Sequence, residues 1–577
     1  MRRFRLLEGS VLSALCLTAV VAHGDAQSNP PPSADKAALC VSRPALAGPP
    51  TTLAQWAAGA QLFDGLGDFH RGITTQSPEA QAYFDQGMRF LWAFNHDEAS
   101  RSFARAAQLD PGCAMCFWGV ALTIGPNYNL PMMMEPRARI AWQAVQQAKS
   151  DAQNATPVEQ ALIAALAERY PNDSPLDPST QGPVLIAYAK AMQDVARKFP
   201  NDNDVQTLTA EAMMTTNAWK LWSLDGAPAP GTREILARLE GVMVRDPHHP
   251  GANHYYIHAV EASPSPQDAV PAAERLEGMM PAAGHLEHMP AHIMQRVGRY
   301  ADAAEANRKG AAADIAYLAK TRPLDYYVMY TAHNYQFLAF STAMEGRKAE
   351  TVDAMRKAHA IISVDLLAAM PGSDWYNAHL YAAMVRFGLW DDILAEPAPD
   401  PRLNGLNVSY RYARTTALAA KGQVVDAKAE LAALKKLVTA TSPDDSAGLN
   451  RAADVYAVAV LVAEARIAAA EADNDRAITL LVEAAGAEDD LAYDEPSDWF
   501  FPVRHLLGVA LLRAGRAGDA EAVYREYLRR HPDNGWALYG LAQALDAQGK
   551  AADARATRQQ FETAWKAADI TLVASAF

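Results

Sequence analysis

Four histidines in the middle of the chain have spacing that suits a metal site. They form two pairs, each with its members four residues apart, and the second pair follows the first by 34 residues: His254 with His258, and His288 with His292. Residues four apart on a helix have Cβ atoms about 5–6 Å apart, so each pair can present two imidazoles on one face. Imidazole-rich sites suit zinc, copper, iron or nickel. The spacing therefore predicts a transition metal, most simply copper, zinc or iron, bound by these side chains.

Two further residues of the same stretch are candidates for this site. In 34-residue frames that begin at Pro250 and Gly284, the paired histidines are fifth and ninth, Glu261 is twelfth and His285 is second. Steps of three and four residues keep these positions on one helical face. We expect His285 to supply another ligand or a supporting hydrogen bond. If the ion activates water or oxygen, Glu261 is the best-placed general base. The sequence leaves open whether the protein is an enzyme.

The second histidine pair has a competing local signal. Pro290 lies between His288 and His292, and a helix interior does not normally carry proline. A helix that begins at Pro290 would place His288 at its cap and remove the one-turn geometry of the pair, although a cap residue can still face the same side. Duplication of a repeat would also copy a purely structural histidine pair. His333 is second in a later 34-residue frame. Considered alone, it is interpreted as a packed aromatic neighbour.

The elements that must position these residues repeat with the same period. Helical patterning begins at Ser77-Pro78, where Ser77 is the expected N-cap. Small, aromatic and closing proline residues recur at fixed places in the 34-residue frames: Gly87, Phe90, Ala99, Phe103, Ala106 and Pro111 near the start, and Leu507, Gly508, Leu511, Ala520, Tyr524 and Pro532 near the end. Gly515 and Gly549, also 34 apart, mark turns between helices.

This pattern resembles the tetratricopeptide repeat. The resemblance covers most of the chain after residue 78 and is strong at both ends but patchy between them. The chain as a whole resembles an exported bacterial protein of that type. The resemblance implies an all-α fold, an α-solenoid of stacked antiparallel helix pairs with a concave groove. In that family, positions two, five, nine and twelve of the first helix face the groove, so the histidine pairs would converge there on one ion. It also implies a protein or peptide partner in the groove. Some members clamp a peptide carboxylate with Lys and Asn at positions five and nine, where this chain has His.

The N-terminus predicts an export signal. Arg2, Arg3 and Arg5 precede the apolar run 11–22, with small residues at Gly24 and Ala26. The run is short for a membrane span, so we expect cleavage to release a periplasmic or secreted protein without one. Arg2-Arg3 leaves twin-arginine and general secretory export both open.

Three cysteines remain after such cleavage, and two of them predict a disulfide. Cys113 and Cys116 are three apart, whereas Cys40 has no partner of similar spacing. No histidine follows Cys116 directly, which excludes a haem-attachment motif, and no second Cys or His pair with zinc-ribbon spacing follows. An oxidising compartment favours a Cys113–Cys116 disulfide.

The amino-acid composition excludes some classes of function. Half of the residues are hydrophobic, enough for a large core, and 66 acidic against 52 basic residues give a net charge of -14. No basic cluster offsets this charge, so we expect no nucleic-acid partner. The chain also lacks a Gly-rich phosphate loop, a G-x-S-x-G elbow and an H-E-x-x-H motif, which are signatures of nucleotide-binding proteins, serine hydrolases and zinc proteases.

We therefore expect five segments: a signal peptide at 1–26, a Pro-rich segment at 27–77, N-terminal repeats at 78–249, central His-rich repeats at 250–331 and C-terminal repeats at 332–577. The favoured function is metal binding by the central repeats, with metal-dependent chemistry on a small substrate as an extension. The alternative is a peptide-binding or protein-binding scaffold of the cell envelope without metal or catalysis.

Overall fold

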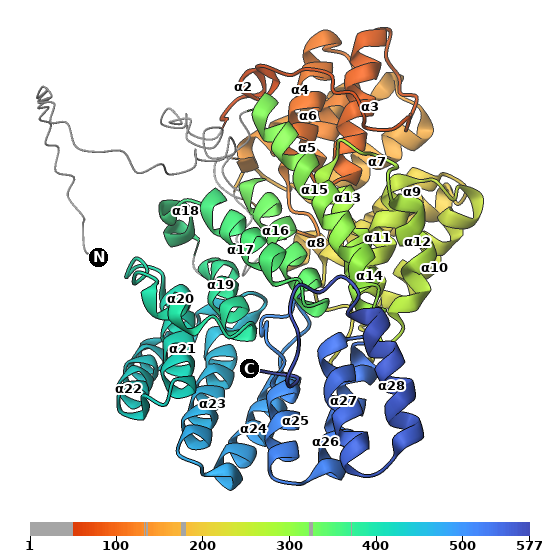
Figure 1. Ribbon diagram of the computed structural model, residues 1–577. Helices are drawn as coiled ribbons and strands as arrows, with labels where there is room; N and C mark the ends of the chain where they lie inside the picture. The colour runs from red at the N-terminus through yellow and green to blue at the C-terminus, as the bar shows by residue number, and fades with distance from the viewer. Residues whose placement is uncertain (1–49, 132, 134–136, 175–180, 322–326, 371) are drawn as a thin grey trace, which may run out of the picture. The chain divides into compact units, whose positions relative to one another are not determined.

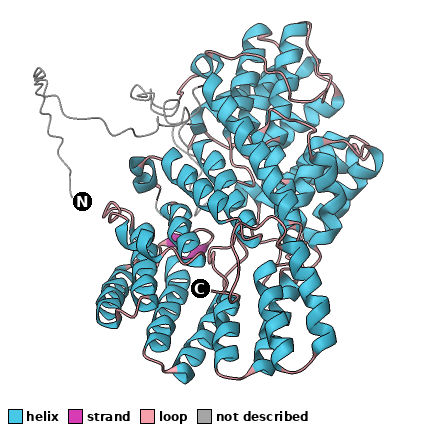
Figure 2. Cartoon of the chain, in the orientation of Figure 1, coloured by secondary structure: helices cyan, strands magenta, loops and turns pink. Residues whose placement is uncertain are grey.

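Helices make up almost all of the regular structure in the computed structural model, which describes residues 50–577 except 132, 134–136, 175–180, 322–326 and 371. The one strand pair in this described part is the short antiparallel β1 (Ser446–Ala447) and β2 (Asn450–Arg451) (Figure 2). The prediction of an all-α fold is confirmed. The predicted signal peptide lies outside the described residues. None of the helices within the described ranges is both long and apolar enough to cross a bilayer.

Consecutive helices pack as antiparallel neighbours along the chain (Figure 1). The N-terminal helices are α2 (Leu53–Ala57), α3 (Pro78–Trp92), α4 (His96–Leu109), α5 (Ala114–Ile124), α6 (Arg137–Asp151), α7 (Pro157–Ala167), α8 (Gly182–Lys198), α9 (Asn203–Thr215) and α10 (Thr232–Arg245). As expected, α3 begins at Pro78, with the Ser77 side chain accepting a hydrogen bond from the backbone N–H of Ala80.

The remaining helices continue the same pairing. The central ones are α11 (Pro250–Val260), α12 (Val270–Leu276), α13 (Gly284–His288), α14 (Pro290–Arg296), α15 (Tyr300–Lys320) and α16 (Tyr327–Met344). They are followed by α17 (Lys348–Ile361), α18 (Val364–Ala369), α19 (Asp374–Arg386), α20 (Trp390–Ala395), α21 (Asn404–Ala420) and α22 (Val424–Ala440). The last are α23 (Ala452–Ala470), α24 (Asn474–Asp489), α25 (Val503–Arg513), α26 (Ala517–Arg530), α27 (Gly535–Ala547) and α28 (Ala551–Ala564). The α-solenoid class is confirmed, while the segment boundaries stay predictions.

The repeated glycines explain how helices of neighbouring repeats approach each other. Gly87 of α3 and Gly119 of α5 both lie against the ring of Phe103 in α4, and a Cβ added at Gly87 would come 2.6 Å from that ring. Gly508 and Gly540 hold the Tyr524 ring of α26 in the same way. An aromatic ring between two glycines is therefore the packing unit at both ends of the chain, because only a residue without a side chain leaves room for it.

The hydrophobic interior forms two large clusters that meet at α15 and α16. One runs from Trp56 to Phe337 and the other from Tyr300 to Ala576. The second cluster includes a contact between distant repeats, because Trp536 of α27 donates a hydrogen bond from Nε1 to the carbonyl of Ala343 at 2.8 Å. This hydrogen bond links α27 to the C-terminal end of α16, although the two helices are far apart in the sequence.

A glycine-to-alanine pair tests the ring-between-glycines packing. Gly508→Ala and Gly540→Ala should each destabilise the protein by about 1–3 kcal/mol, because the new methyl group overlaps the buried Tyr524 ring. Gly486→Ala, on α24 with nothing within 4 Å of the new Cβ, is the control and should stabilise by about 0.5–1 kcal/mol through helix propensity. Urea unfolding followed by circular dichroism measures all three, and equal midpoints for all three would contradict the packing.

Candidate metal centre

Helix α11 places the first histidine pair in the protein interior. His254 is 0 % exposed and His258 is 2 % exposed. His254 Nδ1 donates a hydrogen bond to the carbonyl of Trp92 at 2.5 Å, and His258 Nδ1 donates to Glu261 Oε1 at 3.1 Å. A neutral imidazole that donates through Nδ1 has its lone pair on Nε2. Both rings therefore present Nε2 as the free ligand atom.

The second pair converges although its helix is interrupted. Helix α13 ends at His288 and α14 begins at Pro290, so the proline does break the helix, as its type requires. His288 Nδ1 nevertheless bonds Asn307 Oδ1 at 2.7 Å, and His292 Nδ1 bonds Glu261 Oε2 at 2.8 Å. The Nε2 atoms of the two rings lie 2.6 Å apart. Met289, not His288, is the cap between the two helices, and His288 as the last residue of α13 still reaches His292 across the break.

Two more histidines join these pairs. His285 Nε2 lies 3.2 Å from His254 Nε2, and the His333 ring of α16 lies 4.8 Å from the His288 ring between centroids. Figure 1 shows the helices that carry them, α11, α13, α14 and α16, next to one another. Three groups of side chains have ligand atoms within 4.8 Å of one another: His254 with His258 and His285, His288 with His292 and His333, and His258 with Glu261 and His292.

The two predicted pairs come close together, and each forms a triad with one more histidine, His285 or His333. A third group, His258 with Glu261 and His292, takes one histidine from each pair, and the single ion expected from the sequence stays a prediction. His333, which the sequence suggests only as a packed neighbour, lies with the second triad. His285 and His288 lie on the same short helix, α13, and approach different neighbours: His285 Nε2 lies 3.2 Å from His254 Nε2 of α11, whereas the His288 ring lies 4.8 Å from the His333 ring of α16.

Glu261 connects the two triads and is ionised. It follows the last residue of α11 and is 1 % exposed, and each of its oxygens accepts from one histidine. Burial by itself would raise the pKa of Glu261, but His258 and His292 outweigh burial and lower it to about 2. A carboxylate with so low a pKa is a weak general base. Its geometry favours orienting the two rings over the catalytic role that the sequence suggests.

Four of the histidines are held neutral. Burial in the interior, reinforced by neighbouring imidazoles, lowers the pKa of His254, His285 and His288 well below the usual value, and lowers the pKa of His333 to about 3. A neutral ring keeps the lone pair that a metal ion needs.

Glu495 is a member of the site that the sequence does not reveal. It lies between α24 and α25, is 3 % exposed, and its Oε2 contacts His292 Nδ1 beside Glu261. Burial raises the pKa of Glu495 well above the usual value, and the charge on Glu261 raises it further. Its position more than 200 residues after His292 leaves no spacing that could have pointed to it. Asn307, which accepts the hydrogen bond from His288, lies within the regular helical pattern of α15, so the sequence does not single it out either.

Aromatic side chains pack around the histidine cluster. The Phe94 ring lies 4.5 Å from the His254 ring and 5.6 Å from the rings of His258 and His285 between centroids. Tyr128 and Trp219 pack on the other side of His258 at 5.4 and 5.6 Å. The histidines that the repeat frame places on an open groove are therefore buried, because these large rings occupy the groove at that point.

Comparison with known proteins identifies the repeat type. A tetratricopeptide-repeat family model matches residues 511–560, which include all of α26 and α27 and most of α28. The chain carries tetratricopeptide repeats. This confirms the resemblance seen in the sequence, while the exported bacterial type remains a prediction.

The tetratricopeptide-repeat chain is also similar to solved structures. Human IFIT1, solved as a dimer with m7Gppp-AAAA, is 12 % identical over 78 % of this chain and 90 % of its own, with a TM-score of 0.32. Yeast Tom70 is 12 % identical over 85 % and 92 %, with a TM-score of 0.28. Likenesses this distant say nothing about the site. A search of curated proteins finds no match to the chain.

Asp314 of α15 supports the helix that carries His285 and His288. It is 0 % exposed and accepts hydrogen bonds from Tyr327 Oη at 2.8 Å and Asn334 Nδ2 at 2.9 Å. Its carboxylate also lies where a Cβ on Gly284 would stand, so α13 can approach α15 this closely only because its first residue is glycine. Burial raises the pKa of Asp314 to about 7.

The raised pKa of Asp314 predicts a pH dependence of stability. The folded protein keeps this proton up to about pH 7, whereas the unfolded chain loses it near the ordinary value of 3.8. The free energy of unfolding should therefore fall as pH rises between these values, by up to about 1.4 kcal/mol per pH unit. Asp314→Asn should remove that fall, so its stability relative to the native protein should be higher at pH 8 than at pH 5.

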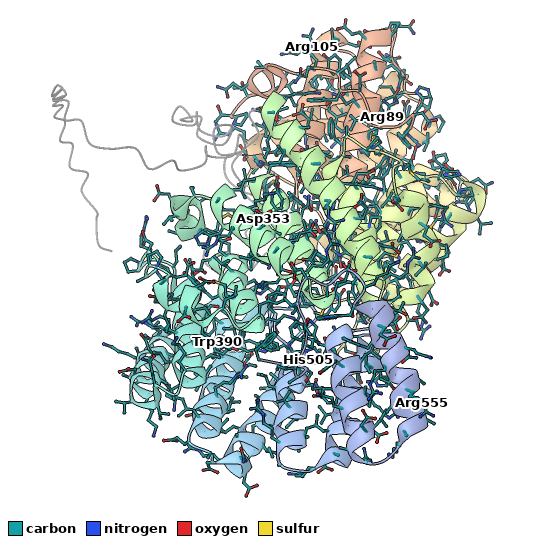
Figure 3. The ribbon with its side chains drawn as sticks, in the orientation of Figure 1. Arg89, Arg105, Asp353, Trp390, His505 and Arg555 are labelled. Atoms are coloured by element: carbon teal, nitrogen blue, oxygen red, sulfur yellow. A yellow bond between two sulfur atoms is a disulfide. The ribbon has the colours of Figure 1, made fainter. Side chains whose placement is uncertain are left out.

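Denaturant unfolding at the two pH values measures this difference. The control is Asp353→Asn, which changes a 60 % exposed carboxylate on α17 (Figure 3) and should show the same pH dependence as the native protein. A constant offset between Asp314→Asn and the native protein at both pH values would contradict the expected titration.

Proposed function

We propose that this tetratricopeptide-repeat protein binds a transition metal, copper, zinc or iron, at the centre formed by His254, His258, His285, His288 and His292. This proposal rests mainly on the shared orientation of the imidazole rings. In four of the five histidines Nδ1 is bonded to an oxygen acceptor, which leaves Nε2 as the ligand atom. The Nε2 atoms of His254 and His285 lie 3.2 Å apart, and those of His288 and His292 lie 2.6 Å apart. Metal-binding histidines have this arrangement, because the Nδ1 bond sets both the tautomer and the direction of the lone pair.

The donor set suits these metals. All the nitrogen ligands are imidazoles, which suit copper, zinc and iron, and no thiolate lies in the three ligand groups. An ion held here would act as a Lewis acid or lower the pKa of a bound water. Glu261 would hold the rings of His258 and His292, and the surrounding aromatic side chains would exclude bulk water. The dense burial limits any substrate to a small molecule.

Protein binding is the second candidate, supported by the repeats themselves, because tetratricopeptide-repeat proteins generally bind protein partners. A peptide that contacted the histidines would first have to displace Phe94, Tyr128 and Trp219, which cover them. We therefore assign any peptide partner to another surface, and regard the histidines as a metal centre within a scaffold.

We also propose that the protein is exported. The basic residues and the apolar run at the N-terminus support this proposal, and so does the Cys113–Cys116 disulfide in the structure. Protein recovered from the periplasm or medium should begin within a few residues of Ala26. Both cysteines should resist alkylation until a reductant is added. Peptide mass mapping measures both properties, and free thiols at Cys113 and Cys116 in unreduced protein would contradict the disulfide.

Metal content tests the main proposal. Untagged native protein should contain copper, zinc or iron by elemental analysis, and the double variant His254→Ala/His288→Ala should lose at least 10-fold in affinity, because each change removes one ligand. The matched control is His379→Ala/His505→Ala, which removes two buried histidines outside the cluster (Figure 3 labels His505). Metal-free native protein that binds none of these ions in titration would end the proposal. Equal losses in the two double variants would show that the site lies elsewhere.

A further inference from the structure

We propose that the histidine cluster holds two neighbouring metal ions, one in each triad. The inference rests on the proposed metal-binding function and deepens it. The first site is His254, His258 and His285, and the second is His288, His292 and His333.

Two of the three ligand groups share no residue, while the third, His258 with Glu261 and His292, takes one histidine from each of them. Bonds of about 2.0–2.1 Å from imidazole to zinc place the ligands of one ion no more than about 4.2 Å apart. The atoms of each triad lie within 4.8 Å of one another, so a small movement brings three nitrogens onto one ion. His254 joins only the first triad and His333 only the second. One ion shared by all six rings would need both outer histidines to move.

The two sites nevertheless adjoin. The rings of His258 and His292, one from each triad, have centroids 5.6 Å apart, and those of His285 and His288 lie 5.7 Å apart. These separations match the spacing inside the first triad, where the His258 and His285 rings are 6.0 Å apart. Nothing larger than a side chain separates the two ligand sets, so two bound ions would be close neighbours.

Glu261 is the structural reason to treat the sites as a pair. One oxygen accepts from His258 of the first site and the other from His292 of the second. Both bonds go to Nδ1, so the carboxylate orients a ligand in each site without occupying either Nε2. Its single negative charge thereby supports both ions at once. A lone metal site would have no use for this second, symmetrically placed bond.

The number of protein ligands indicates what else would bind. Three protein ligands on each ion leave a coordination position for an exogenous ligand, as in catalytic metal sites that bind water or substrate. Two such positions side by side suit a small oxygen-donor ligand, such as water or hydroxide, that contacts both ions. The burial of the histidines excludes larger ligands. We therefore infer a two-ion centre for small-molecule chemistry, with Glu261 as a positioning residue.

Stoichiometry tests the inference on the full-length mature protein. Chelator-stripped protein is titrated with zinc ions alone and, separately, with cupric ions alone, and bound metal is counted by elemental analysis and native mass spectrometry. We expect two ions per chain. His285→Gln and His333→Gln should each bind one, because each removes a ligand from a different triad. His505→Gln, a buried histidine outside both, should still bind two.

The outcomes separate the two proposals. No bound metal would overturn the proposed function itself, whereas one ion per chain in the native protein would overturn only the two-ion inference. The native stoichiometry decides this even if a variant fails to fold, which circular dichroism reports. Loss of all metal in both single variants would also contradict two separate triads.

Cupric ions allow a measurement that depends on two bound ions being close together. Histidines with a purely structural role would not give that result. Two neighbouring cupric ions couple magnetically, so the electron paramagnetic resonance signal of the native protein should be broadened or should account for less copper than is bound. The one-ion variants should give a sharp signal equal to their copper content. A full, uncoupled signal in the doubly loaded native protein would show that the ions are far apart and would overturn the inference.

Discussion

Burial of imidazoles is the constraint on which the centre of this structure depends. Each ring has two nitrogens, and leaving one unsatisfied in a dry interior costs about 1–3 kcal/mol. Here four Nδ1 atoms find oxygen acceptors, at Trp92, Asn307 and the two oxygens of Glu261. The Nε2 atoms face one another instead, as at His288 and His292. That arrangement is costly unless something else binds the nitrogens, and a metal ion meets that need.

The rest of the fold keeps this cluster dry. Phe94 and Trp219 come from turns of the N-terminal repeats, and both adopt positive φ angles of 52° and 62° to reach the histidines. Glu495 approaches from between α24 and α25, so the C-terminal repeats also contribute to the same centre. Trp536 of α27 bonds the carbonyl of Ala343 near the end of α16.

Much of the site could be predicted because the repeat frame and the histidine spacing reinforce each other. The pairs on α11 and on α13–α14, with His285 and Glu261, come together as residues three or four apart on matching helices should. The frame undervalued His333, whose relation to His288 crosses from one repeat to another. The assignment of one ion to the two pairs stays a prediction.

The local patterns of the sequence alone determined the helices, their 34-residue pairing, the glycine positions that admit Phe103 and Tyr524, and the location of the histidines on facing helices. These properties depend on neighbours three, four or 34 residues apart, so they are visible in one dimension. Only the tertiary structure decided the burial of the cluster, its division into two triads and the participation of Asn307 and Glu495. Those features depend on contacts between segments with no fixed spacing, and they are set by how the rings and loops fill the space that the helices leave.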